Sequence, residues 1–123
     1  MSVNEELQLM ALYECTFICR HDMSPADVKK LSDDMQKVIT DRDGKVIKEE
    51  QWGLRSLAYK INKASKGHYV FFGLNCPHAA LAEMERQMRL NEDVIRMLSV
   101  KVEKMDTSPS VVMKHKSGDA DAA

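Results

Sequence analysis

The chain has 123 residues, of which 44% are hydrophobic and 30% charged, so it is long enough for one domain with a buried core. Its formal net charge is -1, which excludes a protein that binds nucleic acid through overall positive charge alone. The sequence has neither a run of about 18 apolar residues nor a basic region before an apolar one at its start, which excludes a transmembrane helix and a signal peptide.

The first predicted element is a strand over residues 12–19, after a short leader at residues 1–9. Alternate positions of this strand are apolar, namely Tyr13, Cys15, Phe17 and Cys19. Three cysteines form an odd set without a framework spacing, so we expect reduced, buried thiols rather than disulfides.

A helix is predicted next. Ser24 is suited to cap it, Pro25 suits its first turn, and Asp27 stands three residues after the cap. An apolar stripe at helical spacing follows, made of Val28, Leu31, Met35, Val38 and Ile39. The pair Asp43-Gly44 predicts a turn that closes the segment.

A long hairpin should follow the helix. Residues 45–62 are predicted as a strand with a bulge or bend at Trp52-Gly53, because glycine inside a strand pattern favours one. We expect a five-residue loop at residues 63–67, which ends in Gly67, and a third strand over residues 68–76.

The last elements are a helix that Pro77 opens and a strand over residues 94–102. The helix should end near Asn91 and bury Leu81, Met84 and Met88. The order strand, helix, strand, strand, helix, strand predicts an α+β, ferredoxin-like split βαβ domain (βαββαβ) over residues 10–104. Its four-stranded antiparallel sheet would carry both helices on one face. Residues 105–123 are polar and are expected to be a disordered tail.

Both faces of the predicted sheet have apolar side chains. On the third strand Tyr69 and Phe71 point one way, and a second set points the other way, namely Val70, Phe72 and Leu74. The fourth strand divides likewise into Leu98, Val100 and Val102 against Ile95 and Met97. Parity does not decide which set meets the helices. An uncovered apolar face indicates a protein partner or RNA bases docked there, or self-cover by the leader or tail. We favour a partner, because the tail is polar.

Metal and catalytic sites are not predicted. Cys15 and Cys19 lie roughly 13 Å apart along a strand, too far to share a zinc ion with His21. Cys76, near His78, falls at the opposite end of the sheet from Cys19. We expect neighbouring carboxylates such as Glu49-Glu50 to be exposed to solvent. No nucleophile motif or glycine-rich phosphate loop is present, so we expect a protein that is not an enzyme and has no cofactor.

Basic residues are concentrated in the hairpin. Residues 45–68 contain six Lys or Arg residues against two Glu residues, with aromatic residues interleaved. This pattern suits RNA contact, and it equally suits a solvated edge that lysines protect from aggregation.

The segment Gly-Leu-Arg-Ser-Leu-Ala-Tyr-Lys-Ile at residues 53–61 resembles a stretch of the bacterial small-subunit ribosomal protein S-six family. Tyr13-Glu14, the Lys-Gly-His-Tyr run at residues 66–69 and the Arg-Leu-Asn-Glu-Asp-Val-Ile-Arg run at residues 89–96 are similar to that family as well. The resemblance extends over residues 10–104 in unbroken order.

This resemblance implies the same fold and a structural role in the small ribosomal subunit. Such a protein would bind the central domain of small-subunit ribosomal RNA, together with ribosomal protein S-eighteen on the open sheet face, and neither DNA nor a membrane. It would be located in the cytoplasm of a bacterium, or in an organelle of bacterial descent. The expected RNA- or partner-binding residues are Arg55, Tyr59, Lys60, Arg89 and Arg96, although Tyr59 also suits a core position. Ser56 departs from the family's second basic residue.

The same fold also fits a second hypothesis. A ferredoxin-like regulatory or ligand-binding domain would form homo-oligomers through its sheet edge and bind a small ligand.

Overall fold

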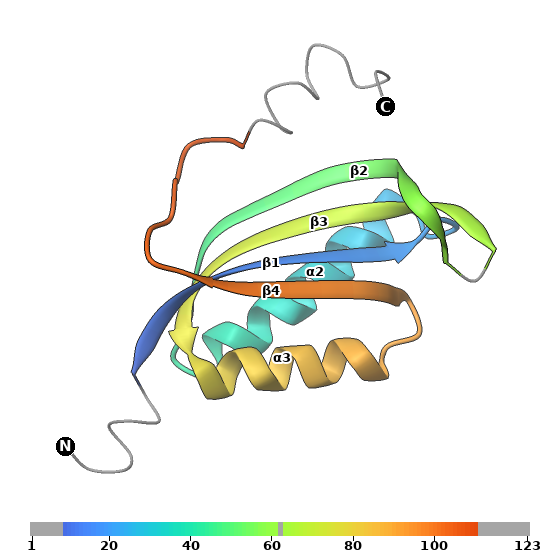
Figure 1. The fold of residues 1–123 in the computed structure, drawn as a ribbon. Coiled ribbons are helices and arrows are strands. Elements are labelled where there is room, and N and C mark those ends of the chain that lie inside the picture. The colour runs from blue at the N-terminus through green and yellow to red at the C-terminus, as the bar shows by residue number, and fades with distance from the viewer. Residues whose placement is uncertain (1–8, 62, 111–123) are drawn as a thin grey trace.

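The computed structural model describes residues 9–61 and 63–110. They form four strands and two helices in the predicted order: β1 Met10–Arg20, α2 Pro25–Thr40, β2 Lys45–Ile61, β3 Ala64–Pro77, α3 His78–Leu90 and β4 Val94–Val102. The sheet is antiparallel with strand order β2-β3-β1-β4, and both helices cover the same face (Figure 1). The predicted ferredoxin-like split βαβ fold is therefore confirmed.

The centre of the sheet is built as the alternation in β1 predicts. Tyr13, Cys15, Phe17 and Cys19 are all buried in the core under the helices. Phe17 packs edge-on against Phe72 of β3, with ring centroids 5.2 Å apart. Since β1 lies between β3 and β4, its side chains fill the middle of the single core.

The helix α2 begins and ends close to the predicted positions. The Ser24 hydroxyl accepts a hydrogen bond from the Asp27 backbone N–H at 3.1 Å, and Pro25 occupies the first turn. The whole predicted apolar stripe of this helix is buried. A Cβ at Gly44 would come within 2.6 Å of Cys76 Cβ, so glycine permits the close approach of the turn after the helix.

The predicted loop at residues 63–67 is wrong. The strand β3 already begins at Ala64, which pairs with Ile61, and Gly67 lies inside the ladder opposite Arg55 and Arg20. A Cβ at Gly67 would come within 2.4 Å of Ile18 Cγ2, so this glycine serves close packing rather than a turn. The predicted bulge is confirmed at Gly53, which has a φ of 85° next to a register shift.

The structure shows which apolar set meets the helices. Val70, Phe72 and Leu74 belong to the core, and Tyr69 and Phe71 therefore lie on the opposite, open face. Met97 packs against the core as the alternation in β4 requires. Ile95 does not share that face, because the register shifts between Ile18 and Cys19. Gly67 alternates with Tyr69 and Phe71, so a Cβ at this position would point to the open face. Because this Cβ would lie beside both Ile18 and Ile95, Ile95 belongs to the open face.

The three thiols are free, fully buried and expected to be unreactive in the native protein. Burial raises the pKa of Cys15 and of Cys76 to about 11 and that of Cys19 to about 12. Since only the thiolate reacts, and steric burial adds to the effect, alkylation by iodoacetamide at pH 8 should be at least about a hundredfold slower than in denaturant. Mass spectrometry of the labelled chain measures this. Rapid native labelling of any of the three would contradict the packing.

Candidate functional site

The open face of the sheet has two unlike halves. On β4, Leu98 is 65% exposed and Val100 48%, although both are large apolar side chains. They stand opposite Thr16 and Glu14 of β1. We call Leu98 and Val100 the β4 patch. Its exposure agrees with the predicted uncovered apolar surface.

The other half, over β2 and β3, is covered. Trp52 stacks on Phe71, with ring centroids 5.6 Å apart and planes 7° apart, and Lys48 Nζ lies 5.7 Å from the centre of the Phe71 ring. Phe71 is only 9% exposed. Segment 103–110, which follows β4, runs from the end of β4 past the end of β2 (Figure 1). It contacts Gly73, Lys48 and Glu50 on the face away from the helices. The polar tail was not expected to cover the open face, and this prediction is wrong for residues 105–110. Residues 111–123 lie outside the described part.

Glu50 is also not the solvated carboxylate that its sequence neighbourhood suggests. It is 5% exposed and accepts hydrogen bonds from Trp52 Nε1 at 2.8 Å and from the Ser110 hydroxyl at 2.6 Å. Burial alone would raise its pKa, but these hydrogen bonds and the nearby Lys48 lower the pKa overall. Glu49 likewise accepts hydrogen bonds from Ser32 and Lys29. The alternation of side chains along β2 could have indicated that Glu50 is buried, since Glu50 lies on the same face as Phe71.

Two of the predicted binding residues come together at the end of the hairpin. The Arg96 guanidinium of β4 lies 4.9 Å from the centre of the Tyr59 ring and also donates a hydrogen bond to the Tyr59 hydroxyl. Tyr59 is 59% exposed, so its alternative assignment to the core is excluded. The hairpin reaches beyond the end of β1, whose last residue, Arg20, pairs with Gly67 (Figure 1).

The other three predicted residues are less tightly grouped. Arg89 is exposed in the last turn of α3 and lines a shallow cavity of about 230 Å³ with Arg96. Lys60 is exposed on β2. Arg55 is half-buried, and its Nε donates to the Trp52 carbonyl at 3.2 Å, so one donor supports the bulge while the rest of the guanidinium stays available.

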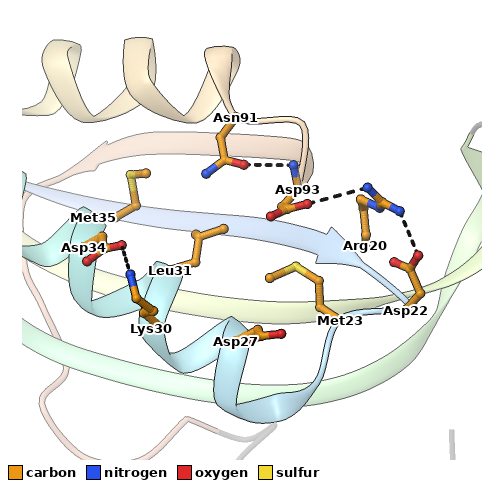
Figure 2. A pocket seen from close by; sticks show the side chains of 10 residues that line it. All are labelled: Arg20, Asp22, Met23, Asp27, Lys30, Leu31, Asp34, Met35, Asn91 and Asp93. Carbon is orange, nitrogen blue, oxygen red and sulfur yellow. Dashed lines mark hydrogen bonds and ion pairs between the residues drawn. The ribbon is translucent and has the colours of Figure 1, made fainter.

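A separate acidic cleft of about 410 Å³ lies between the start of α2 and the connection from α3 to β4. Its carboxylates are largely paired within the protein (Figure 2). Arg20 bonds Asp22 at 2.7 Å and lies 3.6 Å from Asp93, while Lys30 lies 3.3 Å from Asp34. Among the described residues, no group of three His, Cys, Asp or Glu side chains is arranged to hold a metal ion. No described helix has both the length and the apolar character needed to cross a bilayer.

Comparisons with known proteins agree with this architecture. The family model for ribosomal protein S6 matches residues 12–101. Small ribosomal subunit protein bS6 of Paramagnetospirillum magneticum is 48% identical over 110 residues, which cover 89% of this chain and 76% of the relative. The corresponding protein of Rickettsia prowazekii is 45% identical over 108 residues, which cover 88% of this chain and 89% of the relative.

A solved structure supports the same relationship. The crystal structure of 30S ribosomal protein S6 from Thermotoga maritima superimposes with a TM-score of 0.70 at 26% identity. The match covers 90% of this chain and 97% of that one. The similarity therefore extends through the whole sheet and both helices.

Proposed function

The chain belongs to the ribosomal protein S6 family, and we propose that it binds small-subunit ribosomal RNA together with ribosomal protein S-eighteen as a structural component of the small ribosomal subunit. The family match over residues 12–101 carries the proposal. The site acts by binding and not by catalysis, in the cytoplasm of a bacterium.

The β4 patch is the proposed contact for the protein partner. Folding buries little of the apolar surface of Leu98 and Val100, because about half or more of each side chain stays in water. Burying them against a partner removes apolar surface from water, at about 25 cal/mol for each Å². A protein partner suits such a patch better than RNA phosphates do, since the patch supplies no hydrogen-bond donors.

The basic residues beside the patch are the proposed RNA contacts. Arg89 and Arg96 line one cavity at the start of β4, and arginine recognises phosphate oxygens with two parallel hydrogen bonds. Lys60 adds a positive charge on the exposed hairpin. Tyr59 offers an aromatic ring that already binds a guanidinium and suits stacking on an unpaired base. Arg55 contributes its remaining donors from the edge of β2.

The net charge of -1 fits a protein that shares its RNA affinity with a partner. We expect weak RNA binding by the isolated chain and much tighter binding when S-eighteen is present. Filter binding to a central-domain RNA fragment, with and without S-eighteen, tests this. Tight binding of unrelated RNA by the chain alone would contradict it.

Replacing Arg96 with glutamine should weaken RNA binding in the presence of S-eighteen about tenfold, by loss of one charge-assisted contact. The slope of log affinity against log salt should fall by about 1, because one phosphate contact is lost. Lys30→Gln is the control, because Lys30 lies on α2 and pairs there with Asp34. Equal salt slopes for Arg96→Gln and the wild type would remove Arg96 from the interface.

A further inference from the structure

We propose that residues 103–110 form a displaceable strap, which covers part of the open sheet face over β2 and β3 in the free protein and must leave before S-eighteen can occupy the whole face. The inference rests on the proposed function, because it concerns the same partner. It adds a second part of the docking surface, which lies under the strap. The strap and S-eighteen compete for this surface.

The strap crosses the sheet from one edge to the other. It leaves β4 after Val102, passes over β3 at Gly73 and reaches β2 at Lys48 and Glu50. At Gly73 a Cβ would lie 2.8 Å from the Met105 sulfur, so the absence of a side chain at Gly73 leaves the space that Met105 occupies. Met105 is half-buried, whereas residues 106–109 are exposed. The strap is therefore held at spaced anchors and is otherwise solvated.

The main anchor is a nearly buried charge pair. The side chains of Lys48 and Glu50 are 11% and 6% exposed, and their charged atoms are 3.7 Å apart. The strap supplies hydrogen-bond partners to both. Lys48 donates to the Asp106 carbonyl at 2.9 Å, while Glu50 accepts from the backbone N–H of Ser110 at 3.0 Å and from its hydroxyl at 2.6 Å.

This anchoring explains why the strap can be released. Water can replace each of its polar contacts, so the net stabilisation from each hydrogen bond is small. Lys48 and Glu50 stay on β2 and keep one another as partners after the strap leaves. Release of a purely apolar cover would expose its whole contact area to water. Among the strap's described anchors the apolar one is Met105, so release of the strap exposes less apolar surface.

Release of the strap would uncover the sheet at Gly73, Lys48 and Glu50, next to a row of side chains that leads to the β4 patch. Phe71, Thr16 and Leu98 stand opposite one another in a single row across β3, β1 and β4. Trp52 stacks on Phe71 at the far end of this row. Aromatic residues at the centre of an apolar surface are the residues that most often dominate protein–protein affinity. Release removes the Ser110 donors from the Glu50 carboxylate, and a basic side chain of a protein partner supplies replacement donors, whereas an RNA phosphate supplies none.

Ser110→Pro in the full-length chain tests the inference, because proline removes both the N–H and the hydroxyl that Glu50 binds. Ser110→Thr is the matched control, since it keeps both donors. Trp52 is the only tryptophan, and its indole N–H donates to the same Glu50 oxygen as the Ser110 hydroxyl, so acrylamide quenching of its fluorescence reports on this anchor. We expect stronger quenching in Ser110→Pro and unchanged quenching in Ser110→Thr.

The second measurement is the affinity of each variant for purified S-eighteen. A strap that is closed most of the time lowers the apparent affinity by the open fraction, so Ser110→Pro should bind about tenfold more tightly than the wild type. Stronger quenching with unchanged affinity would overturn the competition, and unchanged quenching would overturn the anchor at Glu50. If neither chain binds S-eighteen, the proposed function fails and the inference fails with it. If the wild type binds and the variant binds no better, the inference alone fails.

Discussion

Replacing Leu98 with glutamate is expected to weaken binding of S-eighteen by at least about thirtyfold while it changes the stability of the free protein little. The side chain is 65% exposed, so a carboxylate there stays hydrated in the free chain. In the complex the same carboxylate would be buried without a partner, and an unpaired buried charge at an interface costs about 2–5 kcal/mol. Isothermal titration with purified S-eighteen and a thermal melt by circular dichroism measure the two effects.

Lys101→Gln is the control for this experiment. Lys101 is exposed on the same strand but stands opposite Tyr13, on the other face of the sheet. It should bind S-eighteen like the wild type. If Leu98→Glu also binds like the wild type, the β4 patch is not part of the interface.

Replacing Phe17 with alanine should lower the free energy of unfolding by about 3–5 kcal/mol. The side chain is fully buried at the centre of the sheet and packs against Phe72. Its loss removes apolar contacts and leaves a cavity that neighbouring strands cannot easily close. Such a loss is a large share of the about 5–15 kcal/mol that holds a typical domain folded. Urea denaturation followed by circular dichroism gives the value.

Tyr59→Ala provides the comparison, because it removes an aromatic ring of similar size from an exposed position. It should cost less than about 1 kcal/mol, since only the contact with Arg96 is lost. A cost for Tyr59→Ala similar to that of Phe17→Ala would mean that the hairpin packs as part of the core.

The fold was predictable from local signals that agree with one another. Alternation in β1, the Ser24-Pro25 helix start and the stripe of Leu81, Met84 and Met88 each specify one element, and the structure confirms them. Errors arose where glycine or a register shift acts through a neighbouring strand. Gly67 resembles a loop residue in the sequence, but Ile18 on the adjacent strand determines its role.

The contacts of the candidate site were harder to predict, because they join residues far apart in the chain. Tyr59 and Arg96 are 37 positions apart, and Glu50 and Ser110 are 60 apart. Periodicity places residues on faces, but it gives no distance across a sheet. The strap was missed for a further reason. Its anchors are hydrogen bonds to Lys48 and Glu50, and a polar composition suggests a solvated tail unless the buried charges beneath it are known.

Sucrose-gradient sedimentation of a bacterial lysate that contains the tagged chain tests whether this protein is a component of the small ribosomal subunit. We expect the chain to sediment with the small subunit, in about equal amount to S-eighteen, and Leu98→Glu to reduce this association. A chain that stays at the top of the gradient as a discrete homodimer, without small-subunit RNA or proteins, would instead favour a regulatory or ligand-binding domain.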